Sequence, residues 1–308
     1  METRPIGSLE VSAVGIGCNN FGYRLDVDTT SAVVDAALEA GINFFDTADV
    51  YGDTQSEEYL GRVLGRRRDD VVLATKFGAE IDEQRKGARP EYVRRAIEDS
   101  LRRLRTDRID LYQLHTPDPE VPIQDTLGAL DELVRAGKVR EIGCSNFSAD
   151  QLREAQGAAF DDSARFASVQ NEYSLLHRDP ENDVIPESER AGIAFVPYFP
   201  LANGLLTGKY RPGQPAPEGS RLQSSSRTED LLTDQNLAVV AKLVEFSESR
   251  GHTILELAFS WLLRQPAVAS VIAGATSPEQ AKSNAAAAGW QLTDAELSEV
   301  DGILSRSV

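Results

Sequence analysis

The stretch VVLATKFGAEIDEQRKGARPEYVRRAIEDSLRRLRTDRIDLYQLH, residues 71–115, contains two short apolar runs separated by a segment with helical periodicity. The runs at 71–75 and 109–115 are rich in Val, Ile, Leu and Tyr. This composition favours buried β-strands. Pro90 opens the segment between them, and proline is well tolerated at the first position of a helix. A strand, a helix and a second strand in this order predict a parallel βαβ unit.

The same alternation recurs along the whole chain. Buried strands are predicted at residues 14–18, 42–45, 71–75, 109–115, 139–145, 167–173, 193–198 and 270–274. Helices are predicted at residues 29–41, 56–65, 90–104, 123–137, 148–156, 184–192, 236–251 together with 253–265, and 278–288. Gly41 and Gly137 close two of these helices, which supports the assignment independently of hydrophobicity.

Eight βα units predict a (β/α)₈ TIM barrel, an α/β fold, with residues 1–308 forming a single domain. An open doubly wound sheet is disfavoured because it has fewer strands and a Gly-rich first turn, and the sequence has no GxGxxG motif. Three additions are expected: an N-terminal β-hairpin within residues 3–18, a long loop at 199–234 after the seventh strand, and an outer helix at 292–307. Connections as long as 199–234 are usually functional or disordered, and we interpret this one as a lid.

The composition is that of an ordinary globular protein, with 41% hydrophobic and 26% charged residues. The formal net charge of −17 argues against a nucleic-acid partner, because phosphate binding needs a basic patch. No run reaches the length of a membrane span, and the N-terminus METRPIGSLE lacks the features of a secretory signal. We therefore expect a cytoplasmic protein whose Cys18 and Cys144 remain thiols, with no metal cluster and no membrane contact.

Polar side chains lie at the ends of three neighbouring predicted strands. Asp46 ends the second strand with Tyr51 just beyond it, Lys76 ends the third, and His115 ends the fourth. Active sites of TIM barrels lie at the carboxyl ends of the strands, so these four side chains are expected to converge. Each also has a structural interpretation, as a helix cap, a packed ring or a solvated charge, but the four together favour catalysis.

The four residues suggest a proton donor. An unperturbed tyrosine has a pKa of about 10 and is a poor acid. The Lys76 ammonium is expected to lower the pKa of Tyr51 by stabilising the phenolate, and Asp46 is expected to keep Lys76 charged and in position. We expect His115 to hydrogen-bond a substrate carbonyl or to share the proton relay.

The segment GATSPEQAKSN, residues 274–284, predicts an anion site. It follows the eighth strand and places Ser277 as a helix N-cap, Pro278 at the first helical position and Gln280 in a capping box. A helix N-terminus in the last loops of a barrel attracts phosphate groups, although many unrelated barrels share this feature.

Several motifs follow one another from end to end of the chain, namely DTADVYG, ATKFG, LYQLHTPD, GKVREIGCSNF, QNEYS, PLANGLLTGKY and VIAGATSPEQ. Together they resemble the aldo-keto reductases. The resemblance implies a (β/α)₈ barrel whose hairpin plugs the bottom, and NADPH-dependent interconversion of carbonyls and alcohols. It further implies that Tyr51 is the general acid, that Lys76 and Asp46 tune it, and that His115 orients the carbonyl.

The resemblance also implies a cofactor site. Ser145, Asn146 and Gln170 are similar to residues that hold the nicotinamide carboxamide, and Tyr198 resembles the aromatic residue that stacks on the nicotinamide ring. Leu201, Gly204 and Lys209 match the family's loop that folds over the pyrophosphate. The segment that binds the adenosine 2′-phosphate and adenine is matched by Gly274, Thr276, Gln280 and Asn284. Ser145 and Asn146 as helix caps, and Tyr198 as a core residue, are the structural alternatives.

The sequence departs from the family pattern in two places. Thr276 stands where many members have Arg or Lys to pair with the 2′-phosphate, so NADPH is expected but NADH is not excluded. Asn19 and Asn20 replace the aromatic residue of the first strand loop, which affects the wall of the substrate pocket.

Three functional hypotheses follow. The leading one is an NADP(H)-dependent oxidoreductase acting on an aldehyde, ketone or sugar-like carbonyl. The second is a redox-sensing regulatory subunit that binds the cofactor and a protein partner with little turnover. The third makes Lys76 a Schiff-base nucleophile of an aldolase-type barrel, which leaves Tyr51 and Asp46 without roles. The sequence does not determine the substrate or the oligomeric state.

Overall fold

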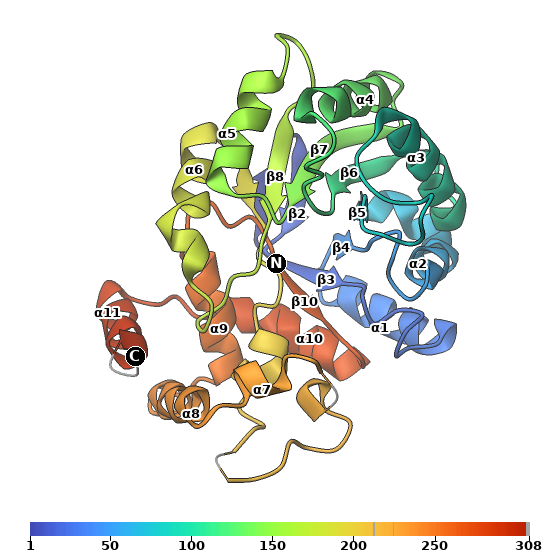
Figure 1. Cartoon of the computed structure of the whole chain (residues 1–308). Helices are drawn as coiled ribbons and strands as arrows, with labels where there is room; N and C mark the ends of the chain where they lie inside the picture. The colour runs from blue at the N-terminus through green and yellow to red at the C-terminus, as the bar shows by residue number, and fades with distance from the viewer. Residues whose placement is uncertain (212, 224, 306–308) are drawn as a thin grey trace.

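A parallel eight-stranded sheet forms the centre of the molecule (Figure 1). The computed structural model describes residues 1–211, 213–223 and 225–305. The strands are β3 (Val14–Gly17), β4 (Phe44–Asp46), β5 (Val72–Phe77), β6 (Ile109–Leu114), β7 (Val139–Ser145), β8 (Phe166–Gln170), β9 (Ala194–Phe195) and β10 (Val271–Gly274). Their order in the sheet is β10-β3-β4-β5-β6-β7-β8-β9, so strands that follow one another in the chain are paired from β3 to β9.

The sheet closes into a barrel between β9 and the segment that leads into β10. The Phe195 N–H donates to the Ala267 carbonyl at 2.7 Å, and the Ala269 N–H donates to the Phe195 carbonyl at 3.0 Å. The predicted (β/α)₈ barrel is confirmed. The seventh strand is shorter than the predicted range 193–198, and Pro197 lies just beyond it, where it has no N–H for a ladder hydrogen bond.

Helices surround the barrel and cover the outer faces of its strands (Figure 1). They are α1 (Val27–Glu39), α2 (Gln55–Leu64), α3 (Pro90–Leu104), α4 (Ile123–Arg135), α5 (Ala149–Ala158), α6 (Val184–Ala191), α9 (Ile254–Leu263) and α10 (Pro278–Ala286). Each matches a predicted helix, with ends displaced by a few residues. Helix α1 begins before the predicted position because Asp26 accepts a hydrogen bond from the Thr29 N–H at 2.8 Å and caps it.

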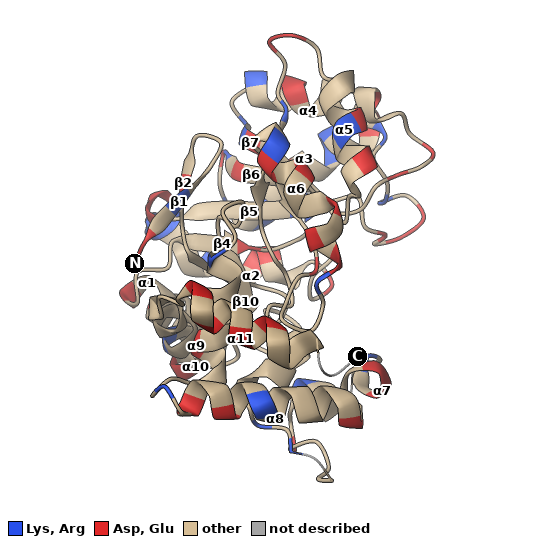
Figure 2. Ribbon diagram, turned by 90° about the vertical axis from the view of Figure 1, so that its left-hand side faces the viewer, with Lys and Arg blue, Asp and Glu red and all other residues tan. Residues whose placement is uncertain are grey.

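The N-terminal hairpin closes one end of the barrel. Strands β1 (Thr3–Ile6) and β2 (Leu9–Ser12) pair antiparallel, and their apolar side chains pack among residues inside the barrel, such as Phe44 and Val72. Figure 2 shows the hairpin at the end of the molecule opposite α7 (Thr228–Leu231). Gly7 allows the tight turn, since it has a φ of +56° and a Cβ there would lie 2.5 Å from the Glu141 carboxyl carbon.

The connection after β9 and the C-terminal helix lie outside the barrel. The predicted loop at 199–234 contains short helical turns, η3 (Ala202–Thr207), η4 (Arg221–Gln223) and α7, with residues 212 and 224 outside the described residues. Helix α8 (Asp234–Glu248) follows, and the predicted outer helix is α11 (Asp294–Ser305), which packs on α8. Residues 306 and 307 of that prediction fall outside the described residues. Within the described ranges, no helix is long and apolar enough to cross a membrane.

Candidate active site

The four predicted catalytic residues meet at the carboxyl ends of β4, β5 and β6. The Lys76 ammonium donates to Asp46 Oδ2 at 2.5 Å and to the Thr47 carbonyl at 2.9 Å, and its distance to the Tyr51 hydroxyl is 3.4 Å. Lys76 has no exposed surface and Asp46 is 2% exposed. The ring of His115 lies edge-on to that of Tyr51, with centroids 5.7 Å apart. The predicted convergence is therefore present.

Two glutamines complete the hydrogen bonding of Asp46. Gln113 Nε2 and Gln170 Nε2 donate to Asp46 Oδ1 at 3.0 and 3.1 Å. Both side chains are buried. Asp46 is therefore held by the Lys76 ammonium on one oxygen and by two amides on the other, which fixes its orientation. Sequence reasoning missed Gln113, although the period of two along a strand places it on the same face as His115.

Lys76 remains charged despite its burial. Desolvation disfavours the ammonium, but attraction to Asp46 and Tyr51 outweighs it, so the pKa of Lys76 is raised above its ordinary value. A Schiff-base nucleophile needs a neutral amine, which burial next to a carboxylate opposes here. The aldolase hypothesis is disfavoured for this reason.

Lys76 lowers the pKa of Tyr51, as expected from the sequence, but the other groups around Tyr51 raise it by more. Burial of the phenol raises the pKa, Lys76 lowers it and Asp46 raises it again, with a net pKa above the ordinary value. The effect of burial on the pKa of Tyr51 is larger than the effect of Lys76, because the negative charge of Asp46 offsets the positive charge of Lys76. Tyr51 is consequently protonated at neutral pH, which is the state that a proton donor requires.

His115 is neutral at physiological pH. Burial, together with repulsion from the Lys76 ammonium, lowers the pKa of His115 to about 3. Its buried Nδ1 has no hydrogen-bond partner among the described residues. A neutral imidazole next to the Tyr51 ring can donate or accept a hydrogen bond without carrying charge.

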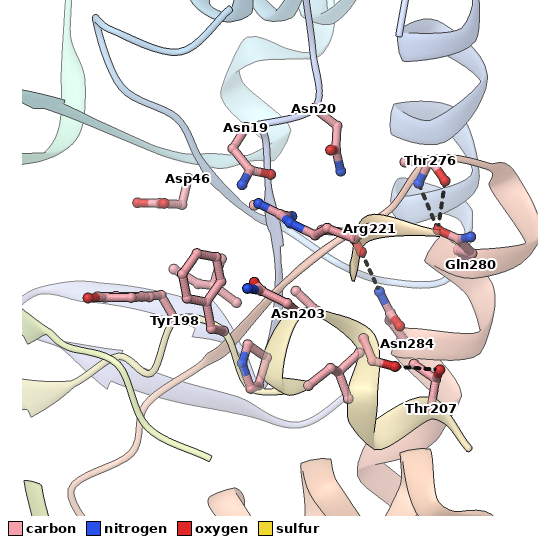
Figure 3. A pocket seen from close by; sticks show the side chains of 18 of the residues that line it. Asn19, Asn20, Asp46, Tyr198, Asn203, Thr207, Arg221, Thr276, Gln280 and Asn284 are labelled. Carbon is pink, nitrogen blue, oxygen red and sulfur yellow. Dashed lines mark hydrogen bonds between the residues drawn. The ribbon is translucent and has the colours of Figure 1, made fainter. Parts of the chain in front are cut away.

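A pocket of about 720 Å³ opens above these residues (Figure 3). Asp46, Tyr51 and His115 line it, whereas Lys76 lies beneath its floor. Asn19 and Asn20 also line it, at the position where the sequence departs from the family. All the residues predicted to bind a cofactor line this pocket, namely Ser145, Asn146, Gln170, Tyr198, Leu201, Gly204, Lys209, Gly274, Thr276, Gln280 and Asn284.

Asn146 connects two strands at one side of the pocket. Its Nδ2 donates to the His115 carbonyl at 2.9 Å, and its Oδ1 accepts from the Tyr198 hydroxyl at 2.8 Å. The Ser145 hydroxyl donates to the Gln170 carbonyl at 2.7 Å. Helix α5 is instead capped by Ser148, so the alternative of Ser145 and Asn146 as caps is wrong.

The N-terminus of α10 faces the pocket, as predicted. The Ser277 side chain accepts from the Gln280 N–H and caps the helix, with Pro278 in the first turn. The predicted reciprocal bond of a capping box is displaced by one residue, because Gln280 Oε1 accepts from the Thr276 N–H at 2.9 Å and from its hydroxyl at 3.0 Å (Figure 3). Thr276 and Gln280 thus form a polar pair at the pocket wall.

The segment after Tyr198 forms a second wall of the pocket. Gly204 has a φ of +93°, and a Cβ at this residue would lie 3.5 Å from the Lys209 ammonium. The buried Asn203 Oδ1 has no partner among the described residues. Sequence reasoning missed Asn203, and also Arg24, Arg221 and Ser283, which line the same pocket. Ser283 could have been found, since it lies one helical turn after Gln280 in the predicted helix, whereas Arg24, Asn203 and Arg221 lie in segments without periodicity.

A parallel barrel thus holds an Asp–Lys–Tyr group at the floor of a polar pocket, an arrangement that suits proton transfer to a bound substrate. A family model described as the Aldo/keto reductase family matches residues 13–305. The chain therefore belongs to the aldo-keto reductase family, and it is an oxidoreductase enzyme.

Individual relatives agree with this assignment. Protein tas of Escherichia coli (strain K12) is 34% identical over 332 aligned residues, which cover 97% of this chain and 96% of that protein. The aldo-keto reductase YhdN of Bacillus subtilis (strain 168) is 34% identical over 310 residues, covering 97% and 92%. Among solved structures, a glycerol dehydrogenase from Gluconobacter oxydans has a TM-score of 0.87 at 33% identity, covering 99% of this chain and 95% of that one.

Proposed function

We propose that this protein is an NADP(H)-dependent oxidoreductase that interconverts an aldehyde, ketone or sugar-like carbonyl with its alcohol, with Tyr51 as the general acid. The observation that carries the proposal is the contact of the buried, charged Lys76 with both Asp46 and the Tyr51 hydroxyl at the floor of the pocket. A nicotinamide cofactor, when bound in the pocket, would donate the hydride to the carbonyl carbon or accept it from the alcohol. The residues of the chain then handle the proton and the orientation of the carbonyl.

Each catalytic residue has a role that follows from its charge state. Protonated Tyr51 donates a proton to the carbonyl oxygen as negative charge develops there. Lys76 stabilises the phenolate that forms, and Asp46 keeps Lys76 in place. Neutral His115 donates a hydrogen bond to the same carbonyl oxygen, which positions the substrate without adding charge.

The pocket suits a dinucleotide. Its volume falls within the usual range for cofactor sites. The N-terminus of α10 and the Lys209 ammonium supply groups for phosphates, and Asn203 Oδ1, which has no partner among the described residues, supplies an acceptor. Thr276 has no positive charge to pair with the 2′-phosphate of NADP, and its N–H and hydroxyl both donate to Gln280 Oε1, so NAD remains a candidate cofactor.

The proposal also covers the setting of the reaction. It treats residues 1–308 as one catalytic domain that acts on small molecules in the cytoplasm, without nucleic-acid or membrane partners. The net charge of −17 supports the absence of a nucleic-acid partner. The name of the Gluconobacter relative adds glycerol to the alcohols that merit testing.

A steady-state assay tests the proposal. Purified protein is mixed with NADPH or NADH and para-nitrobenzaldehyde, and the absorbance of the reduced cofactor is followed. We expect turnover that is faster with NADPH. Tight binding of both cofactors without turnover of this aldehyde, or of glycerol in the reverse direction, would contradict it and would favour the redox-sensing subunit.

A further inference from the structure

Gln113 is a buried polar residue inside the barrel, next to the catalytic group. It lies on β6 in register with Lys76 of β5. Its side chain has no exposed surface, whereas Asp46 and Gln170 line the pocket. Gln113 is therefore out of reach of a bound substrate or cofactor, and any effect that it has on the reaction must pass through its neighbours.

The neighbour of Gln113 that belongs to the catalytic group is Asp46. Gln113 Nε2 donates to Asp46 Oδ1 at 3.0 Å, and Gln170 Nε2 donates to the same oxygen at 3.1 Å. An ionised carboxylate only accepts hydrogen bonds, so each amide must turn its nitrogen toward it. An apolar side chain in place of Gln113 would leave Asp46 Oδ1 with one donor instead of two.

The structure makes room for the Gln113 amide and fixes its orientation. On the far side of β6, Gln113 lies in register with Gly143 of β7. A Cβ at Gly143 would lie 3.2 Å from the Gln113 Cγ, so the glycine leaves space for the longer side chain. The Gln113 carbonyl oxygen accepts from Gln170 Nε2 at 3.5 Å. Both polar atoms of the Gln113 amide therefore have partners.

The orientation of Asp46 determines where the Lys76 ammonium lies. Asp46 Oδ2 accepts from Lys76 at 2.5 Å, and because the two oxygens of a carboxylate turn together, the amides that hold Oδ1 also fix Oδ2. Lys76 further contacts the Thr47 carbonyl at 2.9 Å and the Tyr51 hydroxyl at 3.4 Å. A turn of the carboxylate would draw the ammonium away from Tyr51.

We propose that Gln113 is a positioning residue for the reduction. By holding Asp46 Oδ1, it keeps the Lys76 ammonium beside the hydroxyl on which the phenolate forms. The inference rests on the proposed reductase function, and it adds a residue that touches neither substrate nor cofactor. The alternative is that Gln113 only satisfies a buried carboxylate and contributes to stability.

Gln113→Met tests this role because methionine has a similar length and no N–H donor. The kcat with NADPH and para-nitrobenzaldehyde, the KM of the aldehyde and the Kd for NADPH are measured. We expect kcat to fall by about 10–100-fold, the effect of one hydrogen bond to a charged group, with KM and Kd unchanged. The matched control is Gln265→Met, which removes an amide that donates to the Tyr173 hydroxyl at 3.3 Å, and it should keep the wild-type kcat.

Gln113→Glu makes the same contact depend on pH and preserves the size of the side chain. The new carboxyl can donate to Asp46 only while it is protonated, and two carboxyl groups in contact share a proton because both cannot ionise cheaply. The charged groups that face this position are Asp46 on β4 and Lys76 on β5, while Gly143 on β7 and Gln170 on β8 are uncharged.

The sign of the pH effect follows from this shared proton. We expect the kcat of Gln113→Glu to be near that of wild type at about pH 5 and to fall by about tenfold or more toward pH 9, as the second carboxyl ionises and repels Asp46. Wild type and Gln113→Met should show no such limb. A Gln113→Glu profile parallel to that of wild type would contradict the inference.

Two further results would overturn the inference. One is a Gln113→Met variant with a lower Tm and the wild-type kcat, which would leave Gln113 with a structural role alone. The other is a weaker Kd for NADPH that accounts for the whole loss of activity, which would assign Gln113 to the cofactor site. Wild-type turnover that is lost in Tyr51→Phe would leave the reductase function standing in either case.

An NMR measurement tests the positioning without turnover. The Lys76 ammonium is buried among three acceptors, so its hydrogens should exchange slowly enough with water to give a signal, identified by its loss in Lys76→Met. We expect exchange to be faster by about tenfold in Gln113→Met and unchanged in Gln265→Met. Equal exchange in wild type and in Gln113→Met would contradict the inference, even for a protein without reductase activity.

Discussion

His115 follows β6 with a buried Nδ1 that has no partner among the described residues. Its pKa is lowered to about 3, so it stays neutral across the pH range in which the enzyme can be assayed. We predict that the pH profile of kcat/KM between pH 5 and pH 9 shows no ionisation of His115. The profiles of wild type and His115→Gln should have the same shape, with the variant lower throughout. A wild-type limb between pH 6 and pH 7 that disappears in the variant would show that His115 titrates there.

Asp49 is a second buried group with an unusual charge state. It is 1% exposed, its Oδ1 has no partner among the described residues, and Tyr92 donates to its Oδ2 at 3.4 Å. Burial and repulsion from Glu57 raise the pKa of Asp49 to about 7, against partial compensation by Arg103 and Tyr92. The folded protein therefore holds a proton between about pH 4 and pH 7 that the unfolded chain releases.

This proton makes stability depend on pH. Because the folded state binds more protons in this window, the free energy of unfolding falls as pH rises, by about 4 kcal/mol in total. Asp49→Asn should remove this contribution, so the variant should lose less stability than wild type between pH 5 and pH 8 in urea titrations. Asp53→Asn, an exposed carboxyl of the same loop, is the control. A wild-type slope retained in Asp49→Asn would contradict the assignment.

At the residue scale, sequence reasoning succeeded where a side chain lies at the end of a strand. Asp46, Lys76 and His115 could be predicted because the barrel brings strand ends together. The net pKa of Tyr51 could not, since it depends on the balance between burial and charge in three dimensions. Arg221 could not either, because its segment has no periodicity.

At the scale of elements, Gly61 determines how closely α2 and α3 approach. A Cβ at this position would lie 2.5 Å from the carbonyl carbon and oxygen of Leu104, and backbone atoms cannot move aside cheaply. Gly61→Ala should lower the free energy of unfolding by about 1–3 kcal/mol. Gly128→Ala, in α4 with open space around it, should raise it by about 0.5–1 kcal/mol. Urea unfolding of the two variants checks both signs, and an equal effect of the two would show that close packing at Gly61 is not limiting.

Most elements could be predicted because their ends have local signals. Pro90 opens α3, and Gly137 follows α4 with a φ of +72°. The turns within 199–234 are irregular inside, although η3 does end at Gly208 with a φ of +75°. Within η3, Asn203 has a φ of +55° and Gly204 a φ of +93°, conformations that interrupt the helix and that helical propensity does not predict.

At the scale of the whole molecule, the count of eight strands was sufficient to predict the barrel, since parallel strands joined by helices must bury both faces. The closure itself pairs Phe195, which lies in the predicted strand 193–198, with residues 267–269, which the sequence pattern did not mark as a strand. The position of charge was also hidden, because a net charge of −17 gives no indication of a cationic pocket.

Tyr51→Phe provides the most direct test of the account, because it removes the proton donor and keeps the ring. We measure kcat with NADPH and para-nitrobenzaldehyde, and the Kd for NADPH by fluorescence, in wild type and variant. The account predicts a kcat lower by about 10²–10⁴-fold with the Kd unchanged. A variant that turns over as fast as wild type would contradict the assignment of Tyr51 as the general acid.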